Sequence, residues 1–159
     1  MKISLTGTPG TGKTEVARLL VKRLGWKLID LNALADMKNL YKGFDKKRGC
    51  KIVDIKCLSG EVEKTAGDAI IEGHFSHDIP CDFIIVLRCK PGELRKRLEK
   101  RGWSEAKIEE NIEAEIMGIC REEAAESGKE FMEIETTNKN TAETVEKIEK
   151  ELQKYLNKA

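Results

Sequence analysis

The stretch GTPGTGKT, residues 7–14, matches the pattern G-x-x-x-x-G-K-[ST] at every fixed position. Glycines in this pattern let the backbone curl until successive amide N–H groups point inward at phosphate oxygens. Lys13 can reach the β- and γ-phosphates of a nucleotide, and the hydroxyl of Thr14 can bind Mg²⁺. A helix that follows directly points its positive end at the same anion. The pattern therefore predicts a site for a nucleoside triphosphate with magnesium.

The residues on either side of this stretch have the patterns that such a loop requires. Ile3 and Leu5 predict a short buried strand before it. Lys13–Leu24 predicts a helix after it, because apolar residues recur there at spacings of three and four, and Gly25 is a natural end. The alternative is a chance glycine turn between a strand and a helix, which the four fixed residues of the match disfavour.

Strands and helices alternate along the rest of the chain. The further strands expected are Trp26–Asp30, Ala69–Glu72, Phe83–Leu87 and Phe131–Ile134. The further helices expected are Leu31–Tyr41, a stretch after Gly60, Pro91 to about Arg101, one stripe from Ser104 toward Glu126, and a last helix opened by a capping box at Asn140 and Glu143. Between them, Gly43–Cys50 is expected to be a charged loop. The alternation predicts an α/β domain in which helices flank a five-stranded parallel sheet.

Length, charge and cysteine content exclude several classes. The chain has 159 residues, which suits one domain. Its 29 Lys and Arg against 28 Asp and Glu give a net charge of +1, so we expect neither strong direct binding of nucleic acid nor membrane binding. The five cysteines are widely spaced without a C-x-x-C, which is typical of free thiols in a reducing compartment and predicts a cytoplasmic protein. A zinc site made from Cys50, Cys57, His74 and His77 is disfavoured by the ligand spacing.

A GTPase is also disfavoured. Its guanine-reading N-K-x-D motif is met only in part by the residues 138–141, which read NKNT. No aspartate in the chain has a glycine three residues later, so the D-x-x-G switch is missing as well.

The third expected strand ends in an acid, and a histidine follows it. Glu72 ends that strand and faces the expected phosphate loop, where it can orient Mg²⁺ directly or through water. His74, two residues later, can position a water molecule or an acceptor oxygen. The alternatives are a solvated carboxylate at a strand end and a structural loop histidine.

A cationic segment follows the fourth expected strand. Arg97 and Arg101 lie four residues apart and share a helix face, and Arg88 precedes them. Arginines on a closing lid can stabilise the charge that phosphoryl transfer spreads over the γ-phosphate oxygens. The alternative is a solvated basic face, but Arg101 stands directly before Gly102 and Trp103 at an expected hinge. We therefore interpret Arg101, Arg97 and Arg88 as candidate catalytic residues.

Four segments together resemble a known family. GTPGTGKT, LADMKNLYKGFD, the strand-end EGH, and VLR…RLEKRGW followed by a long helix are similar to the small archaeal and nuclear adenylate kinases. This group is related to adenylate kinase isoenzyme six, and its members are also described as ribosome-assembly ATPases. The resemblance covers nearly the whole chain. It implies a P-loop nucleoside monophosphate kinase fold in a single domain over residues 1–159, with a monophosphate-binding region at about 30–54 and a short lid at about 100–110.

The resemblance also implies roles for individual residues. Arg101 would be the lid arginine on ATP, and residues 136–139, with Asn138 among them, would lie near the adenine. Glu72 and His74 match a motif that is usually Asp-x-His in the family. The residues that would line the ATP phosphates are Gly10, Thr11, Gly12, Lys13, Thr14 and Glu15.

The chain departs from the family pattern at Asp36. Relatives can carry an arginine there that is expected to hold the AMP phosphate, which an aspartate would repel. Lys38 and Lys42 are the cations that could replace it. Asp30, at the end of the second expected strand, either contacts the acceptor or starts the next helix.

Three functions are compatible with these residues. In the first, an adenylate kinase transfers the γ-phosphoryl of Mg-ATP to AMP, with Lys13 and Arg101 stabilising the transition state, Thr14 and Glu72 holding the metal, and His74 positioning the attacking oxygen. The second is an ATPase switch in ribosome biogenesis and rRNA processing, whose acceptor is water and whose partner is a small-subunit ribosomal protein. The third is a kinase of another small metabolite, with Asp30 binding its hydroxyl.

Overall fold

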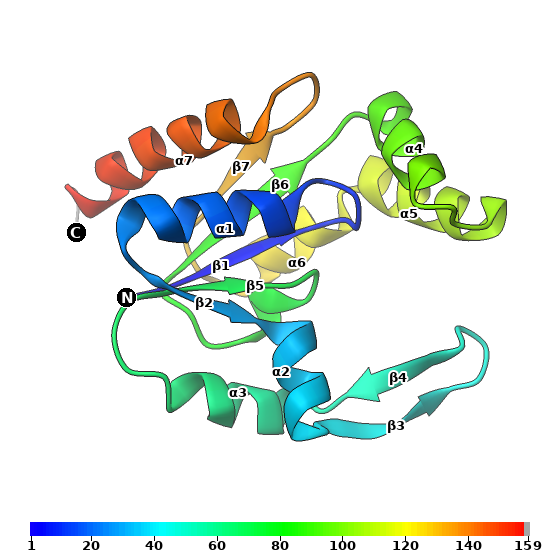
Figure 1. Ribbon diagram of the computed structural model, residues 1–159, viewed down its shortest axis with the longest axis horizontal. Coiled ribbons are helices and arrows are strands. Elements are labelled where there is room, and N and C mark those ends of the chain that lie inside the picture. The colour runs from blue at the N-terminus through cyan, green and yellow to red at the C-terminus, as the bar shows by residue number, and fades with distance from the viewer. Residues whose placement is uncertain (158–159) are drawn as a thin grey trace.

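A five-stranded parallel sheet forms the centre of the computed structural model, which describes residues 1–157 (Figure 1). The strands in spatial order are β2 (Lys27–Asp30), β5 (Ala69–Glu72), β1 (Lys2–Gly7), β6 (Phe83–Arg88) and β7 (Phe131–Glu135). All neighbouring pairs run parallel. Because β1 is the central strand, the loop that follows it leaves the sheet at the middle of its carboxyl edge. The predicted sheet is confirmed.

Helices cover both faces of the sheet. The helices α1 (Lys13–Leu24) and α7 (Thr141–Leu156) lie on one face, and α6 (Ile119–Glu126) lies on the other with the 3-10 turn η1 (Ser76–Asp78) (Figure 1). Side chains of a strand alternate between the faces, so Ile85 packs toward α1 and α7 while Ile84 and Val86 pack against Ala124 of α6. Covering both faces explains why the strands are nearly continuous apolar runs.

Two helices extend from the carboxyl end of β6. The helix α4 (Pro91–Lys100) packs against α5 (Glu105–Met117) through a small apolar cluster that includes Leu94, Leu98 and Ile112. The prediction of one helical stripe from Ser104 to Glu126 was wrong, because Gly118 breaks it with a φ of 67°. Ile116, the next residue of the stripe after Ile108 and Ile112, is 65% exposed.

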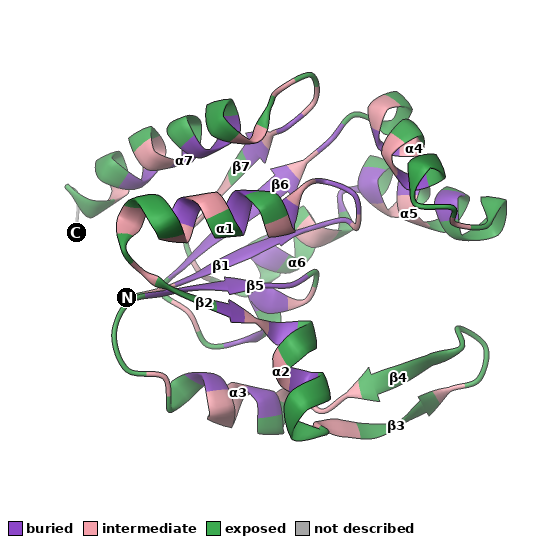
Figure 2. Cartoon of the chain, in the orientation of Figure 1, coloured by how far each residue is buried: buried purple, intermediate pink, exposed green. Residues whose placement is uncertain are grey.

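The segment between β2 and β5 differs most from expectation. The helix α2 (Leu31–Lys38) ends at Asn39, whose left-handed φ of 52° turns the chain. The chain then forms an antiparallel hairpin of β3 (Tyr41–Asp45) and β4 (Cys50–Val53) where a helix end and a charged loop were predicted. Most of this hairpin is exposed and extends away from the sheet (Figure 2).

The helix α3 (Ile55–Glu63) starts earlier than the predicted stretch after Gly60. Asp54 caps it by accepting a hydrogen bond from the amide of Cys57. At the other end of the chain, the predicted capping box of Asn140 and Glu143 is present at the start of α7. Within residues 1–157, no helix is both long and apolar enough to cross a membrane.

Candidate nucleotide-binding site

The loop between β1 and α1 requires its glycines. Gly7 has a φ of 144°, and a Cβ on it would lie 2.5 Å from the carbonyl oxygen of Leu87. Gly10 has a φ of 94°, and a Cβ there would lie 2.8 Å from Leu94 of α4. Gly12, with a φ of 95°, faces open space instead. The loop is therefore packed tightly from outside and is open on its inner side.

The open side of this loop offers backbone N–H groups. Gly12, Lys13 and Thr14 form the start of α1, and their amides donate to no acceptor within residues 1–157. Unpaired amides at the positive end of a helix attract an anion. This backbone fits the phosphates of a nucleotide.

Lys13 lies beneath the loop and is almost fully buried. Its Nζ donates to the carbonyl oxygens of Gly7 at 2.8 Å and Thr8 at 3.2 Å. Burial lowers the pKa of Lys13 from 10.5 to about 8, against the opposing attraction of Glu72. The ammonium is thus held at the loop, next to where phosphate oxygens would lie.

A cavity of about 380 Å³ opens beside this loop, and we call it the phosphate cavity. It brings together residues from the sheet, the loop and α5. Its lining includes most of the residues predicted for catalysis and metal binding. Those lining residues are Pro9, Gly10, Gly12, Lys13, Thr14, Asn32, Glu72, His74, Arg101, Trp103, Lys107 and Asn111.

Glu72 and His74 lie on the sheet side of the phosphate cavity. Glu72 is buried at the end of β5, and this burial raises the pKa of its carboxyl group while Lys13 opposes the rise. Removal of solvent around the imidazole lowers the pKa of His74, and the positive charge of Lys13 lowers it further. His74 is therefore neutral at physiological pH, so one ring nitrogen can accept a hydrogen bond.

The donors around Glu72 suit a magnesium ion. A carboxylate and a hydroxyl are hard oxygen ligands of the kind Mg²⁺ prefers, and Glu72 and Thr14 line the same cavity. Substrate phosphates commonly complete the coordination of such an ion. The residues present therefore fit a magnesium nucleotide.

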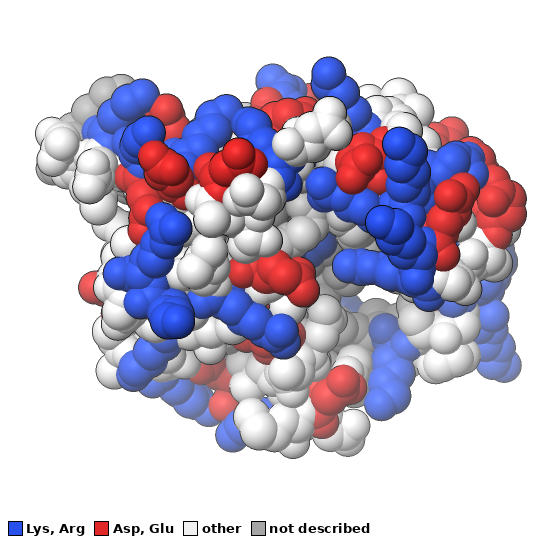
Figure 3. Space-filling view, turned by 45° about the horizontal axis from the view of Figure 1, so that its top comes forward, with Lys and Arg blue, Asp and Glu red and all other residues white. Residues whose placement is uncertain are grey.

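A second cavity of about 390 Å³ adjoins the outer side of the loop, and we call it the nucleoside cavity. Arg101 lines both cavities. Lysine and arginine side chains gather over this part of the molecule (Figure 3). Of the predicted adenine segment, Thr136 and Lys139 line the nucleoside cavity and Asn138 does not. Its other lining residues include Gly10, Thr11, Gly12, Glu15, Arg97 and Lys100.

Arg97 and Arg88 have different surroundings. The guanidinium of Arg97 donates to the carbonyl oxygen of Thr136 at 3.1 Å and faces that of Gly10 at 3.5 Å, so it lies against the loop. Arg88 pairs with Glu115 at 2.8 Å and Glu133 at 2.7 Å and lines neither cavity. The structure brings Arg97 to the site but not Arg88.

Sequence reasoning missed two polar residues of α5. Lys107 and Asn111 line the phosphate cavity, one helical turn apart. The Nζ of Lys107 lies 3.7 Å from the centre of the Trp103 ring, and Arg101 lies 5.7 Å from the same ring. The sequence could have indicated them, because Lys107 and Asn111 each directly precede a buried isoleucine of the apolar stripe, Ile108 and Ile112, and so lie beside the buried face of the helix.

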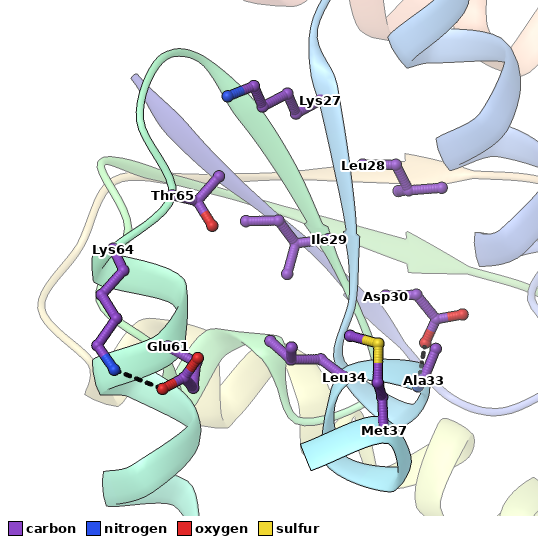
Figure 4. Close-up of a pocket in the computed structure, with 10 residues that line it drawn as sticks. All are labelled: Lys27, Leu28, Ile29, Asp30, Ala33, Leu34, Met37, Glu61, Lys64 and Thr65. Atoms are coloured by element: carbon purple, nitrogen blue, oxygen red, sulfur yellow. Dashed lines mark hydrogen bonds and ion pairs between the residues drawn. The ribbon is translucent and has the colours of Figure 1, made fainter.

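Asp36 and Asp30 act locally in the structure. Asp36 accepts a hydrogen bond from the hydroxyl of Tyr41. Asp30 starts α2 by accepting from the amide of Ala33 at 3.0 Å, one of the two roles considered for it. It also lines a cavity of about 690 Å³ along the outer edge of β2 (Figure 4). No residue of the loop 7–14 lines that cavity, so it is separate from the phosphate cavity.

The chain has the fold of two solved kinases. Shikimate kinase from Acinetobacter baumannii, solved with shikimate, superposes with a TM-score of 0.70 at 17% identity, covering 99% of this chain and 93% of its own. Deoxyadenosine kinase from M. mycoides superposes with a TM-score of 0.61 at 16% identity, covering 98% of this chain and 100% of its own. At such low identity these likenesses show the fold alone.

Sequence relatives identify the family. The model of an AAA domain family matches residues 3–118. A protein of Methanosarcina mazei named "Putative adenylate kinase" is 44% identical over 98% of this chain and 94% of its own length. One of the same name from Methanocaldococcus jannaschii is 40% identical over 93% of this chain and 84% of its own. The chain belongs to this archaeal family of proteins named for adenylate kinase.

Proposed function

We propose that this protein is an adenylate kinase, which transfers the γ-phosphoryl group of ATP to AMP and gives two ADP. The observation that carries the proposal is the phosphate cavity, where Lys13, Arg101 and Lys107 surround a space beside a triphosphate-binding loop. The archaeal relatives named "Putative adenylate kinase" support the choice of AMP as acceptor. The region at about 30–54 would bind the monophosphate, and the region at about 100–110 would close as a lid.

Each residue has a defined part in the proposed transfer. The bond between the γ-phosphorus and the β,γ-bridging oxygen breaks while an oxygen of the AMP phosphate bonds to that phosphorus. Lys13 and Arg101 stabilise negative charge on the transferred group, and His74, being neutral, orients the acceptor without adding charge. Thr14 and Glu72 would hold Mg²⁺, which when bound neutralises charge on the phosphates. Lid closure would exclude water and so suppress hydrolysis.

A product assay on the purified chain tests this function. ATP and Mg²⁺ are incubated with and without AMP, and ADP is resolved from free phosphate. We expect two ADP per ATP only when AMP is present, with no phosphate release. The Lys13→Ala variant should abolish transfer, whereas Lys22→Ala on the exposed side of the same helix should retain it. Near-normal turnover by Lys13→Ala would overturn the assignment.

One observation favours a second function, an ATPase switch. From the region at about 30–54, only the uncharged Asn32 lines the phosphate cavity, and Asp36 is bonded to Tyr41. Without a cation from this region the AMP phosphate is held weakly, and water becomes the competing acceptor. Phosphate release that is indifferent to AMP would establish this switch. Its proposed partner is a small-subunit ribosomal protein, and a pull-down that recovers none in any nucleotide state would count against that partner.

A further inference from the structure

Glu115 is a buried carboxylate that the proposed chemistry does not use. It lies in the last turn of α5, and only 3% of it is exposed. One carboxylate oxygen accepts from the hydroxyl of Thr8 in the phosphate loop. The other accepts from the Nε of Arg88 at 2.8 Å and from the amide of Cys89 at 3.0 Å. A single side chain therefore joins the loop, the end of β6 and α5.

The same face of α5 points into the phosphate cavity. Lys107, Asn111 and Glu115 are spaced by four residues and form one stripe along the helix. Lys107 and Asn111 line the cavity, and the side-chain amide of Asn111 donates to the carbonyl oxygen of Lys107 at 2.7 Å. Because a helix turns as a unit, the contacts of Glu115, together with the packing of Ile108 and Ile112 against α4, fix the direction in which Lys107 points, about 12 Å away along the axis.

Arg88 holds Glu115 from the side opposite to the loop. Its Nη2 donates to the backbone carbonyl oxygen of Glu115 at 3.0 Å, in addition to the ion pair between the side chains. Arg88 is held in turn by Glu133, which also pairs with Arg121 at 3.0 Å. The charge of Arg88 thus compensates a buried carboxylate, because an unpaired one at this place would be strongly destabilising.

We propose that Glu115 is a positioning residue, which ties the phosphate loop to α5 so that Lys107 faces the transferred phosphoryl group. The proposal rests on the proposed phosphoryl transfer and adds a role for a residue remote from the reacting atoms. In this arrangement Thr8 affects the position of Lys107 through its hydrogen bond to Glu115. If that contact served only stability, changes at Thr8 and Glu115 would alter the free energy of unfolding but not kcat.

The test separates the loop contact from the stability of the fold. Thr8→Val keeps the shape of the side chain but removes its donor, and Thr8→Ser keeps the donor. We expect Thr8→Val to lower kcat about tenfold through a small displacement of reacting groups, with the affinity for ADP changed less than about twofold, since the loop amides remain. Thr8→Ser should retain both kcat and the unfolding midpoint in urea. Thr8→Val should lower the midpoint, because it removes one donor to the buried carboxylate of Glu115, so its kcat is measured without urea, where the variant is folded.

A double-mutant cycle with Glu115→Gln decides whether Thr8 acts through Glu115. The double variant should be no slower than Glu115→Gln alone, and additive losses in kcat would overturn the proposal. A Thr8→Val protein with wild-type kcat would also overturn it. ATP turnover is followed with and without AMP, so the cycle applies to either acceptor. If the wild type forms no ADP in response to AMP, the adenylate kinase function is contradicted. The double-mutant cycle is then measured on the rate of phosphate release, which still tests the role of Glu115.

Discussion

At the scale of single residues, the site is built from charges withdrawn from water. Lys13, Glu72 and Glu115 are all buried within or beside the phosphate loop. Burying a charge costs stability unless partners compensate it. Loop carbonyl groups compensate Lys13, and Arg88 with Thr8 compensates Glu115. These charges are held in place before any phosphate arrives, which is the arrangement that electrostatic stabilisation of a transition state requires.

The lowered pKa of Lys13 predicts how ATP affinity depends on pH. Burial brings this pKa to about 8, and phosphate binding requires the protonated ammonium. Affinity should therefore be constant below about pH 8 and fall above it by up to about tenfold per pH unit, because the free protein must then take up a proton to bind. Calorimetric titration with Mg-ATP from pH 6.5 to 9.5 (about three units) measures this slope. The same slope in Lys13→Met would assign it to another group.

Lys107 is expected to contribute to the rate. Lys107→Met keeps the aliphatic stem over Trp103 but removes the charge from the phosphate cavity. The variant should lower kcat by about tenfold or more, because a cation directed at developing charge is lost. Lys96→Met on α4 is the matched control, since Lys96 is exposed and lines neither the phosphate cavity nor the nucleoside cavity. Equal kcat values for the two variants would contradict a role of Lys107 in the transfer step.

At the scale of elements, glycines decide where helices end or continue. Gly118 separates α5 from α6 with a left-handed φ of 67°, whereas Gly60 lies inside α3 in ordinary helical conformation. The break at Gly118 turns the chain directly after Glu115. Ile116 and Met117, the last two residues of α5 before this break, are exposed, at 65% and 63%.

These two glycines give opposite predictions for alanine. Gly118→Ala should lower the free energy of unfolding by about 1–2 kcal/mol, since alanine is strained in the left-handed region. Gly60→Ala should raise it by about 0.5–1 kcal/mol, because a Cβ there meets nothing within 4 Å and the unfolded chain loses freedom. Urea unfolding of both variants measures the difference. A shift of the same sign in both would contradict the conformations described for them.

At the scale of the whole molecule, the sequence predicted the central sheet better than the hairpin and the long-range contacts around it. The loop 7–14 predicted the strand before it, and the apolar runs predicted the other strands of the sheet. Both predictions succeeded because these patterns depend on local residue types. The hairpin of β3 and β4 was missed because α2 ends at Asn39, where no glycine or proline marks the turn, and because the charged residues of Gly43–Cys50 have the pattern of a loop. Glu115 was missed for another reason. Its partners Thr8 and Arg88 lie 107 and 27 residues away in the chain, and only the fold brings them together.

Nucleotide binding should stabilise the whole chain. The loop, α1, α4 and α5 meet at the two cavities, so a ligand there binds only the folded state. At about 100 times its Kd, Mg-ADP should add about 2.7 kcal/mol and raise Tm by about 5–10 °C. Adenosine, which lacks the phosphates that the loop binds, should produce no such shift. A scanning calorimetry experiment checks this, and an equal shift in Lys13→Met would contradict the described site.

The position of Trp103 gives the protein a built-in optical probe. The chain has two tryptophans. Trp26 packs against the apolar cluster that includes residues of α1 and α7, and it lines neither the phosphate cavity nor the nucleoside cavity. Trp103 instead lies beside two cations, Arg101 and Lys107, at the wall of the phosphate cavity. Phosphates bound in this cavity attract the same two cations, so we expect the charge near the indole, and with it the fluorescence emission of Trp103, to change on binding. A Trp26→Phe protein would therefore report occupancy of the site by fluorescence, in real time and without a label.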